Sequence, residues 1–152
     1  MADGSEGLRS GVSRELDVLS SSLMGDALDF LAEGRNVDML LAVQDDQGNL
    51  ASFSFEDDVP EELLRAAKAK VHELDLAGGD PETGLGVPQR YAMTYEGVVA
   101  DETGAYQDAL MLEFGERGWR SYSAYSFFDG RGKGDGFRWT DPAAAGEVEP
   151  LL

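Results

Sequence analysis

Apolar residues recur every three or four positions over residues 8–31, and this spacing predicts a helix with one buried face. The stripe consists of Leu8, Val12, Leu16, Leu19, Leu23, Ala27, Phe30 and Leu31. Three consecutive serines at 20–22 and Gly25 have low helix propensity, so two shorter helices are an alternative to one long helix. Gly34 stands where a left-handed residue would end the last turn.

A second helix is predicted to begin at Pro60, which suits a first helical turn, and to end at the glycine pair 78–79. Asp58 is expected to cap it, and Glu61 completes the pattern of a capping box. Glu61 and Arg65 stand one turn apart and are expected to pair. The predicted buried stripe is Leu63, Leu64, Ala67, Val71 and Leu74.

The remaining apolar segments have the length and alternation of strands. Residues 37–44 are nearly all apolar, which indicates a strand covered on both faces and central in its sheet. Apolar and polar residues alternate over residues 51–56, as in a half-buried strand. Three more strands are predicted over residues 90–100, 107–114 and 119–128.

Three tetrapeptide turns end in glycine, at residues 45–48, 101–104 and 115–118. A type I turn followed by a left-handed glycine joins antiparallel strands in this way. A four-residue loop at the third turn would place Phe114 opposite Trp119 and Met111 opposite Tyr122. The same register predicts a cross-strand ion pair between Glu113 and Arg120.

Together these elements predict an α+β fold, a five-stranded and mainly antiparallel sheet with helices on one face, in the order α-β-β-α-β-β-β. We expect residues 8–128 to form a single domain, residues 1–7 a disordered tail, and residues 129–152 an extended C-terminal tail. Phe137 and Trp139 are the only predicted anchors of that tail.

The predicted element order resembles that of roadblock and profilin-like domains. The resemblance implies a small non-catalytic module that dimerises or serves as a scaffold. The order helix, two strands, helix also resembles zinc-dependent nucleoside deaminases, which use a Cys pair and a His or Cys two residues before a Glu. This chain has no Cys, and Val71 stands two residues before Glu73, so that activity is rejected.

Charge narrows the functional classes. The chain has 30 acidic and 12 basic residues, a net charge of −18, one His and no Cys. Thiolate chemistry and Cys-ligated zinc are therefore excluded, and nucleic acid and anionic membranes should repel the protein. We expect no cofactor and no metal. The simplest explanation of the acidic surface is that it favours solubility. Two alternatives are mimicry of nucleic acid and adaptation to high salt. The small number of lysines, Lys68, Lys70 and Lys133, would suit adaptation to high salt.

The first residues lack the order of a signal peptide, and no apolar run has the length of a membrane span, so we expect a cytoplasmic protein.

Three groups of residues could carry chemistry, and each has a simpler explanation. His72 is expected to be a solvated helix residue. A carboxylate cluster, Glu56, Asp57, Asp58, Glu61 and Glu62, suits the start of a helix better than a metal site. The glycine-rich stretch 130–136 leads into no predicted helix and is expected to be a mobile linker rather than a phosphate loop.

We therefore expect a non-catalytic protein-protein interaction or adaptor module that forms a homo-oligomer or binds a protein partner. The expected contact surface is the sheet face away from the core, carrying Ala109, Met111, Tyr122 and Ala124. One alternative is a small-molecule sensor or carboxylate-using enzyme with its site near the loop at 80–89 and the C-terminal tail. Another is an acidic inhibitor that mimics nucleic acid.

Overall fold

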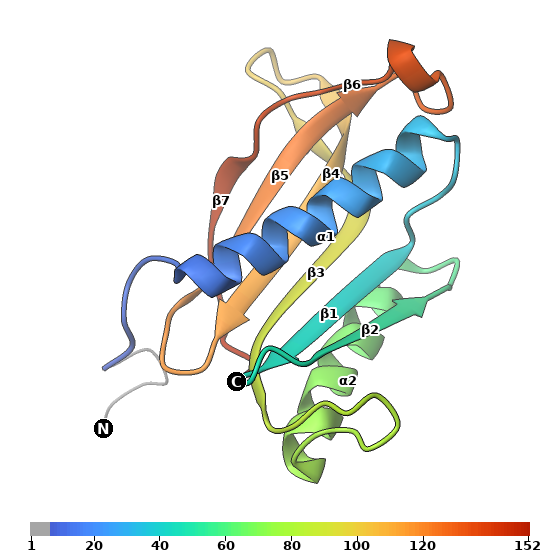
Figure 1. Ribbon diagram of the computed structural model, residues 1–152. Coiled ribbons are helices and arrows are strands. Elements are labelled where there is room, and N and C mark those ends of the chain that lie inside the picture. The colour runs from blue at the N-terminus through green and yellow to red at the C-terminus, as the bar shows by residue number, and fades with distance from the viewer. Residues whose placement is uncertain (1–6) are drawn as a thin grey trace.

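The computed structural model describes residues 7–152 as two helices and a curled antiparallel sheet (Figure 1). The strand order is β2-β1-β3-β4-β5-β6, and β7 also pairs with β5. The predicted α+β class is confirmed. In chain order the elements are α1 (Arg14–Ala32), β1 (Met39–Asp45), β2 (Leu50–Phe55), α2 (Pro60–Ala77), β3 (Pro88–Ala100), β4 (Tyr106–Glu116), β5 (Ser121–Asp129), the 3₁₀ turn η1 (Gly134–Gly136), β6 (Arg138–Trp139) and β7 (Ala143–Val148).

The two helices cover opposite faces of the sheet, as Figure 1 shows, so the predicted placement on one face is wrong. Helix α1 packs over Ala42 and Ala92, whereas α2 packs over Leu41, Val43 and Met93. Successive side chains of a strand point to opposite faces, so the apolar strands β1 and β3 present core residues on both sides. One helix on each face is needed to bury them.

Helix α1 begins at Arg14, later than predicted, because Ser13 is its N-cap residue. The Oγ of Ser13 accepts a hydrogen bond from Leu16 N at 3.1 Å. Leu8 and Val12 of the apolar stripe therefore precede the helix. The helix is continuous through the serine run, and the alternative of two helices is wrong. Gly34 has φ of +87° and ends the helix as predicted.

Helix α2 has no side-chain cap, and its N-cap residue is Val59. The predicted cap by Asp58 and the capping box are wrong. Asp57 instead accepts a hydrogen bond from Val59 N at 2.9 Å. Arg65 pairs with Glu62 at 2.7 Å rather than with Glu61. The inner stripe is confirmed for its buried members Leu63, Ala67, Val71 and Leu74, and Leu64 is half-buried; Gly78 ends the helix with φ of +74°.

Strand β1 lies between β2 and β3, so it is an internal strand, but it stands next to the edge rather than at the centre of the sheet. The half-buried strand β2 is an edge of the sheet, with Ala51 buried. The three predicted turn glycines, Gly48, Gly104 and Gly118, all have φ near +87° (87°, 86° and 86°). The turns at 45–48 and 101–104 are confirmed as sharp connections between antiparallel strands, whereas the connection from β4 to β5 begins only after Glu116.

The predicted register between β4 and β5 is wrong. Phe114 lies opposite Tyr122, three residues beyond the predicted Trp119. The reason is that β4 continues to Glu116, so the turn falls later than assumed. An odd shift moves every side chain of one strand to the other face. Glu113 therefore faces Ser123, and Arg120 pairs with Glu147 at 3.2 Å instead.

The segment after residue 129 extends the sheet, because β6 and β7 both pair with β5. The predicted count of five strands is therefore wrong. Phe137 is buried against Phe128, with ring centroids 5.9 Å apart. The glycine-rich loop contacts the end of α1, where Gly132 N donates to Leu31 O at 2.9 Å, so it is not the linker predicted.

The predicted disordered tail lies outside the described residues except for Gly7. Within residues 7–152 neither helix is long and apolar enough to cross a membrane.

Candidate functional site

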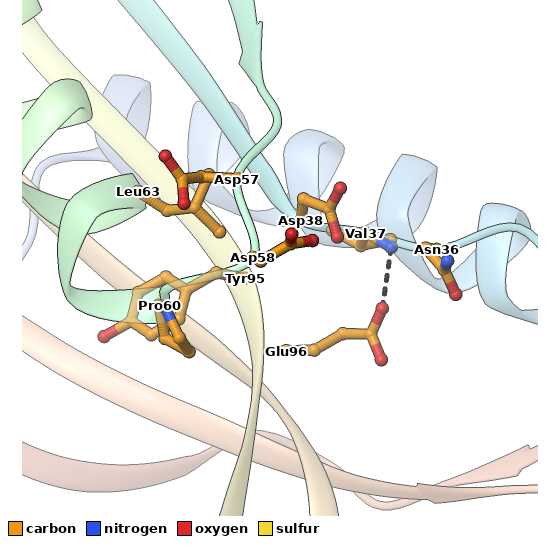
Figure 2. A pocket seen from close by; sticks show the side chains of 9 residues that line it. All are labelled: Asn36, Val37, Asp38, Asp57, Asp58, Pro60, Leu63, Tyr95 and Glu96. Carbon is orange, nitrogen blue, oxygen red and sulfur yellow. Dashed lines mark hydrogen bonds between the residues drawn. The ribbon is translucent and has the colours of Figure 1, made fainter.

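A cavity of about 270 Å³ opens where the start of α2 meets the segment before β1 (Figure 2). Four of its nine lining residues carry carboxylates, and none is basic. The lining residues are Asn36, Val37, Asp38, Asp57, Asp58, Pro60, Leu63, Tyr95 and Glu96. The cavity is therefore an acidic pocket with partly apolar walls, and we refer to it as the acidic pocket.

Strand pairing brings three separate chain segments to this pocket. Asp38 immediately precedes β1, whereas Asp57 and Asp58 follow β2. The last pair between β1 and β2 is Met39 opposite Phe55, so β1 begins and β2 ends beside the pocket. Strand β3 continues past this point, so Tyr95 and Glu96 form another wall.

The four carboxylates differ in the hydrogen bonds and ion pairs that they form with the rest of the protein. Glu96 accepts a hydrogen bond from Val37 N at 2.8 Å and forms an ion pair with Arg131. Asp57 accepts one from Val59 N. By contrast, no hydrogen bond or ion pair within residues 7–152 involves the side chains of Asp38 and Asp58. In Figure 2 these two carboxylates lie between the start of α2 and the segment leading into β1.

Helix α2 explains how several like charges coexist in this pocket. The first turn of a helix carries unpaired N–H groups and the positive end of the dipole, which stabilise nearby carboxylates. Asp57 and Asp58 stand directly before that turn. Even so, Arg131 is the only basic residue among residues 7–152 that pairs with a lining carboxylate, so the pocket should attract cations. Across residues 7–152, no three His, Asp or Glu side chains are placed to hold a metal ion.

The apolar side of the pocket comes from Pro60, Leu63 and the ring of Tyr95. The Tyr95 hydroxyl donates to Glu113 at 2.7 Å, so Tyr95 contributes its ring rather than its hydroxyl. Burial, followed by the hydrogen bond to Glu113 and its charge, raises the pKa of Tyr95 far above the ordinary value, which keeps the hydroxyl neutral. Carboxylates beside an apolar wall match a cation on an aliphatic stem, as in Lys or Arg.

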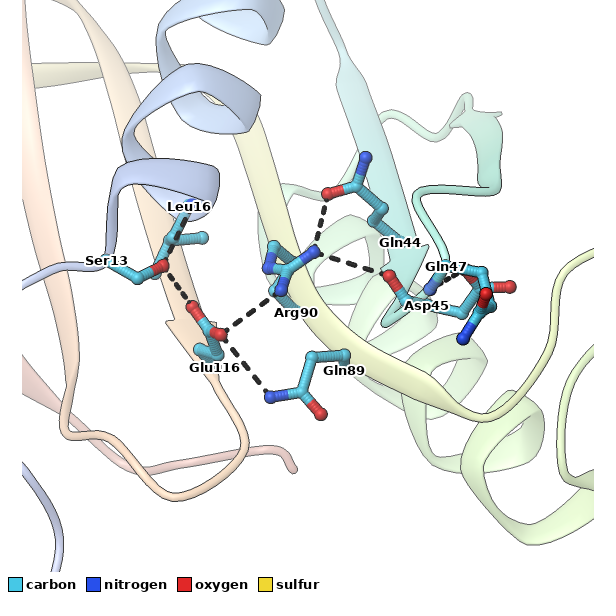
Figure 3. A network of polar contacts seen from close by, with 8 residues as sticks. All are labelled: Ser13, Leu16, Gln44, Asp45, Gln47, Gln89, Arg90 and Glu116. Atoms are coloured by element: carbon cyan, nitrogen blue, oxygen red, sulfur yellow. Dashed lines mark hydrogen bonds and ion pairs between the residues drawn. The ribbon is translucent and has the colours of Figure 1, made fainter.

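A second polar cluster is closed to ligands. Figure 3 shows Glu116 between Ser13, Gln89 and Arg90. The Arg90 side chain is 9% exposed and that of Glu116 6%, and Arg90 also donates to Gln44 Oε1 at 2.8 Å. This network joins the start of α1 to strands β1, β3 and β4, and its role is structural.

The loop at 80–89, proposed above as part of a site, borders a cavity of about 360 Å³ near the β1–β2 turn. Asp45, at the end of β1, also lines this cavity. Its side chain is buried and accepts a hydrogen bond from Gly86 N at 2.7 Å. Burial alone would raise the pKa of Asp45, but hydrogen bonds from Gly86, Asn49 and Gln47 outweigh it and hold the pKa below its usual value. Asp45 therefore holds the loop against the turn.

The structure does not bring the four predicted surface residues onto one face. Ala109 and Met111 lie on the α2 side of the sheet, whereas Tyr122 and Ala124 lie on the α1 side, in register with Phe114 and Leu112. Ala109 and Ala124 are buried. The register error accounts for the difference, and a partner contact through these residues stays a prediction.

Sequence analysis singled out Asp57 and Asp58 but missed Asp38 and Tyr95. No local motif marks these two, because only the pairing of β1 with β3 places them beside the start of α2. His72 is exposed on α2 and makes no hydrogen bond within the described residues.

Comparison of the chain with protein-family models, with curated proteins and with solved structures gave no match. The resemblance to roadblock and profilin-like domains rested on a five-strand element order, which the structure does not match exactly, and no comparison supports it. The geometry and charge of the acidic pocket are therefore the basis for a functional proposal.

Proposed function

We propose that the protein is a non-catalytic interaction module for a basic protein partner, and that a Lys or Arg side chain of the partner enters the acidic pocket. The observation that carries the proposal is the pair of carboxylates on Asp38 and Asp58, which lack a cationic partner within the described chain. A net charge of −18 would attract a basic partner from a distance.

The size of the pocket supports a side chain as its occupant. Sites for cofactors and drug-sized ligands have volumes of about 300–1,000 Å³. At about 270 Å³ the acidic pocket lies just below that range. A pocket of this size can hold one long side chain.

The lining offers carboxylates and one amide as its polar groups, which favours recognition of a cation over catalysis by a hydroxyl, thiol or amine. Nucleophilic catalysis by a hydroxyl, thiol or amine needs that group within hydrogen-bond reach of a base. The lining contains no Ser, Thr, Cys, His or Lys, and the Tyr95 hydroxyl donates to Glu113. The remaining polar groups are carboxylates and an amide, which suit recognition of a cation.

Pairing in the pocket can supply only part of the affinity. A solvent-accessible ion pair is worth about 0.2–1 kcal/mol. Two such pairs with Asp38 and Asp58 would therefore contribute about tenfold in affinity. The wider acidic surface would mainly raise the association rate, and added salt would reduce that effect.

Binding of a labelled Lys-rich peptide, followed by fluorescence anisotropy, tests the proposal. Exchanging Asp38 and Asp58 together for Asn should weaken binding by about tenfold. The matched control exchanges Glu82 and Glu102 for Gln; both are exposed and lie outside the pocket, so the net charge changes equally. Equal weakening by both double variants would mean that overall charge alone attracts the peptide, and the pocket proposal would be wrong.

A further inference from the structure

Strand β2 is an open edge of the sheet, and the chain that follows it, Asp57 and Asp58, lines the acidic pocket. It pairs with β1 alone among the described strands, and Figure 1 shows it at the margin of the sheet. Its six residues, LASFSF, include no charged residue and no proline, although 28% of the chain is charged. Edges are usually protected by charges, proline or bulges, because their backbone groups can pair with another chain. This edge lacks those protections.

Alternate residues of β2 point their backbone N–H and C=O groups away from β1, toward the open side of the edge. At the turn, Asp45 N donates to Asn49 O at 3.1 Å, which sets the phase of the antiparallel ladder. Hydrogen-bonded positions then fall on Ala51 and Phe53, opposite Val43 and Leu41. The N–H and C=O groups of Ser52 and Ser54 consequently point away from β1, and both residues are exposed.

Acidic residues flank the neutral edge at both ends. The turn that precedes β2 carries the exposed Asp46, and β2 leads into Asp57 and Asp58 at the acidic pocket. An extended segment lying along β2 would span about 20 Å, at about 3.3 Å per residue. Basic residues at the two ends of such a segment would meet carboxylates at each end.

We propose that β2 accepts an extended segment of the basic partner as an added strand, which places a Lys or Arg of that segment in the acidic pocket. This inference rests on the proposed function and adds how the partner is held. In strand addition, main-chain hydrogen bonds provide affinity and side-chain sites provide specificity. A second copy of this chain is disfavoured as the occupant, because each copy carries a net charge of −18.

The test uses the full chain and a seven-residue peptide of alternating Val and Thr with Lys at both ends. Ser52→Pro and Ser54→Pro each remove one outward N–H and leave the bonding positions toward β1 intact. Each should weaken peptide binding by about tenfold, whereas Ser52→Thr should leave it within about twofold. N-methylation of the peptide at alternate residues should weaken binding similarly and requires no change in the protein.

The outcomes separate the two proposals. Weakening by proline and by N-methylation, with normal melting temperatures, supports strand addition. If only the exchange of Asp38 and Asp58 weakens binding, strand addition is wrong and the pocket proposal stands. If only proline and N-methylation weaken it, strand addition stands and the pocket proposal is wrong. If none of these changes weakens binding, both proposals are overturned.

Discussion

Arg90 on β3 and Glu116 on β4 form an ion pair of 3.3 Å in which both side chains are less than one-tenth exposed. Breaking such a pair leaves a buried charge without compensation, which typically costs about 3–5 kcal/mol. We expect Glu116→Ala to lower the free energy of unfolding by this amount in urea denaturation. Arg65→Ala, which removes the exposed pair with Glu62, should change it by less than about 1 kcal/mol. Similar losses from both variants would contradict a structural role for the buried network.

Ser13 couples helix α1 to this network, because its Oγ donates to Glu116 at 2.5 Å and accepts from Leu16 N. Ser13→Ala removes both the cap and the bond to the carboxylate, and should cost about 1–2 kcal/mol. Ser21, exposed in the interior of the same helix, is the matched control. Ser21→Ala should be neutral or slightly stabilising, since Ala has the higher helix propensity. A neutral Ser13→Ala variant would show that the cap is dispensable.

Tyr91 and Tyr95 predict a loss of stability at alkaline pH. The pKa of Tyr91 is raised to about 12. Burial is the main cause, the charge of Glu113 adds to it, and the hydrogen bond to Ser121 opposes it. The pKa of Tyr95 is also raised, again mainly by burial. Above pH ~10 the unfolded chain loses these protons while the folded chain keeps them, so the free energy of unfolding falls as the pH rises.

The expected slope is at most about 1.4 kcal/mol per pH unit for each tyrosine between pH ~10 and ~12. Urea denaturation at a series of pH values measures it. Exchanging Tyr91 and Tyr95 for Phe should flatten the slope even though it lowers stability at neutral pH. An unchanged slope in that double variant would assign the alkaline loss to other groups.

Phe137 and Trp139 test whether the C-terminal segment stabilises the fold. Phe137 is 4% exposed in the core under α1, whereas Trp139 is 56% exposed. Phe137→Ala should therefore cost about 3–5 kcal/mol, and Trp139→Ala clearly less. Thermal unfolding followed by circular dichroism compares them. Equal and small losses would mean that the segment after β5 contributes little to stability.

Local patterns predicted most of the secondary structure but little of its assembly. The buried stripe of α2 and the left-handed Gly48, Gly104 and Gly118 follow from local periodicity and backbone sterics. The register of β5 does not, because the length of β4 beyond Phe114 decides it. Strand β7 was missed because its run of Ala and Gly has no alternation, and pairing with β5 forms it.

The acidic pocket was only partly predictable for the same reason. Asp57 and Asp58 are neighbours in the chain and were identified as part of a carboxylate cluster. Asp38 and Tyr95 join them through strand pairing, a long-range feature that leaves no local pattern. The assignment of Asp58 as a cap also concealed its availability to a ligand, since Val59 is the N-cap residue.

Nuclear magnetic resonance with an isotope-labelled chain tests the pocket most directly. The protein is titrated with a lysine capped at both ends, and then with capped norleucine, which has the same aliphatic stem without the charge. The account predicts that lysine shifts the backbone amides of residues 36–38, 57–63 and 95–96 most strongly, and that norleucine does not. Shifts spread evenly over the acidic surface, or centred on another part of the chain, would contradict the acidic pocket as the cation site.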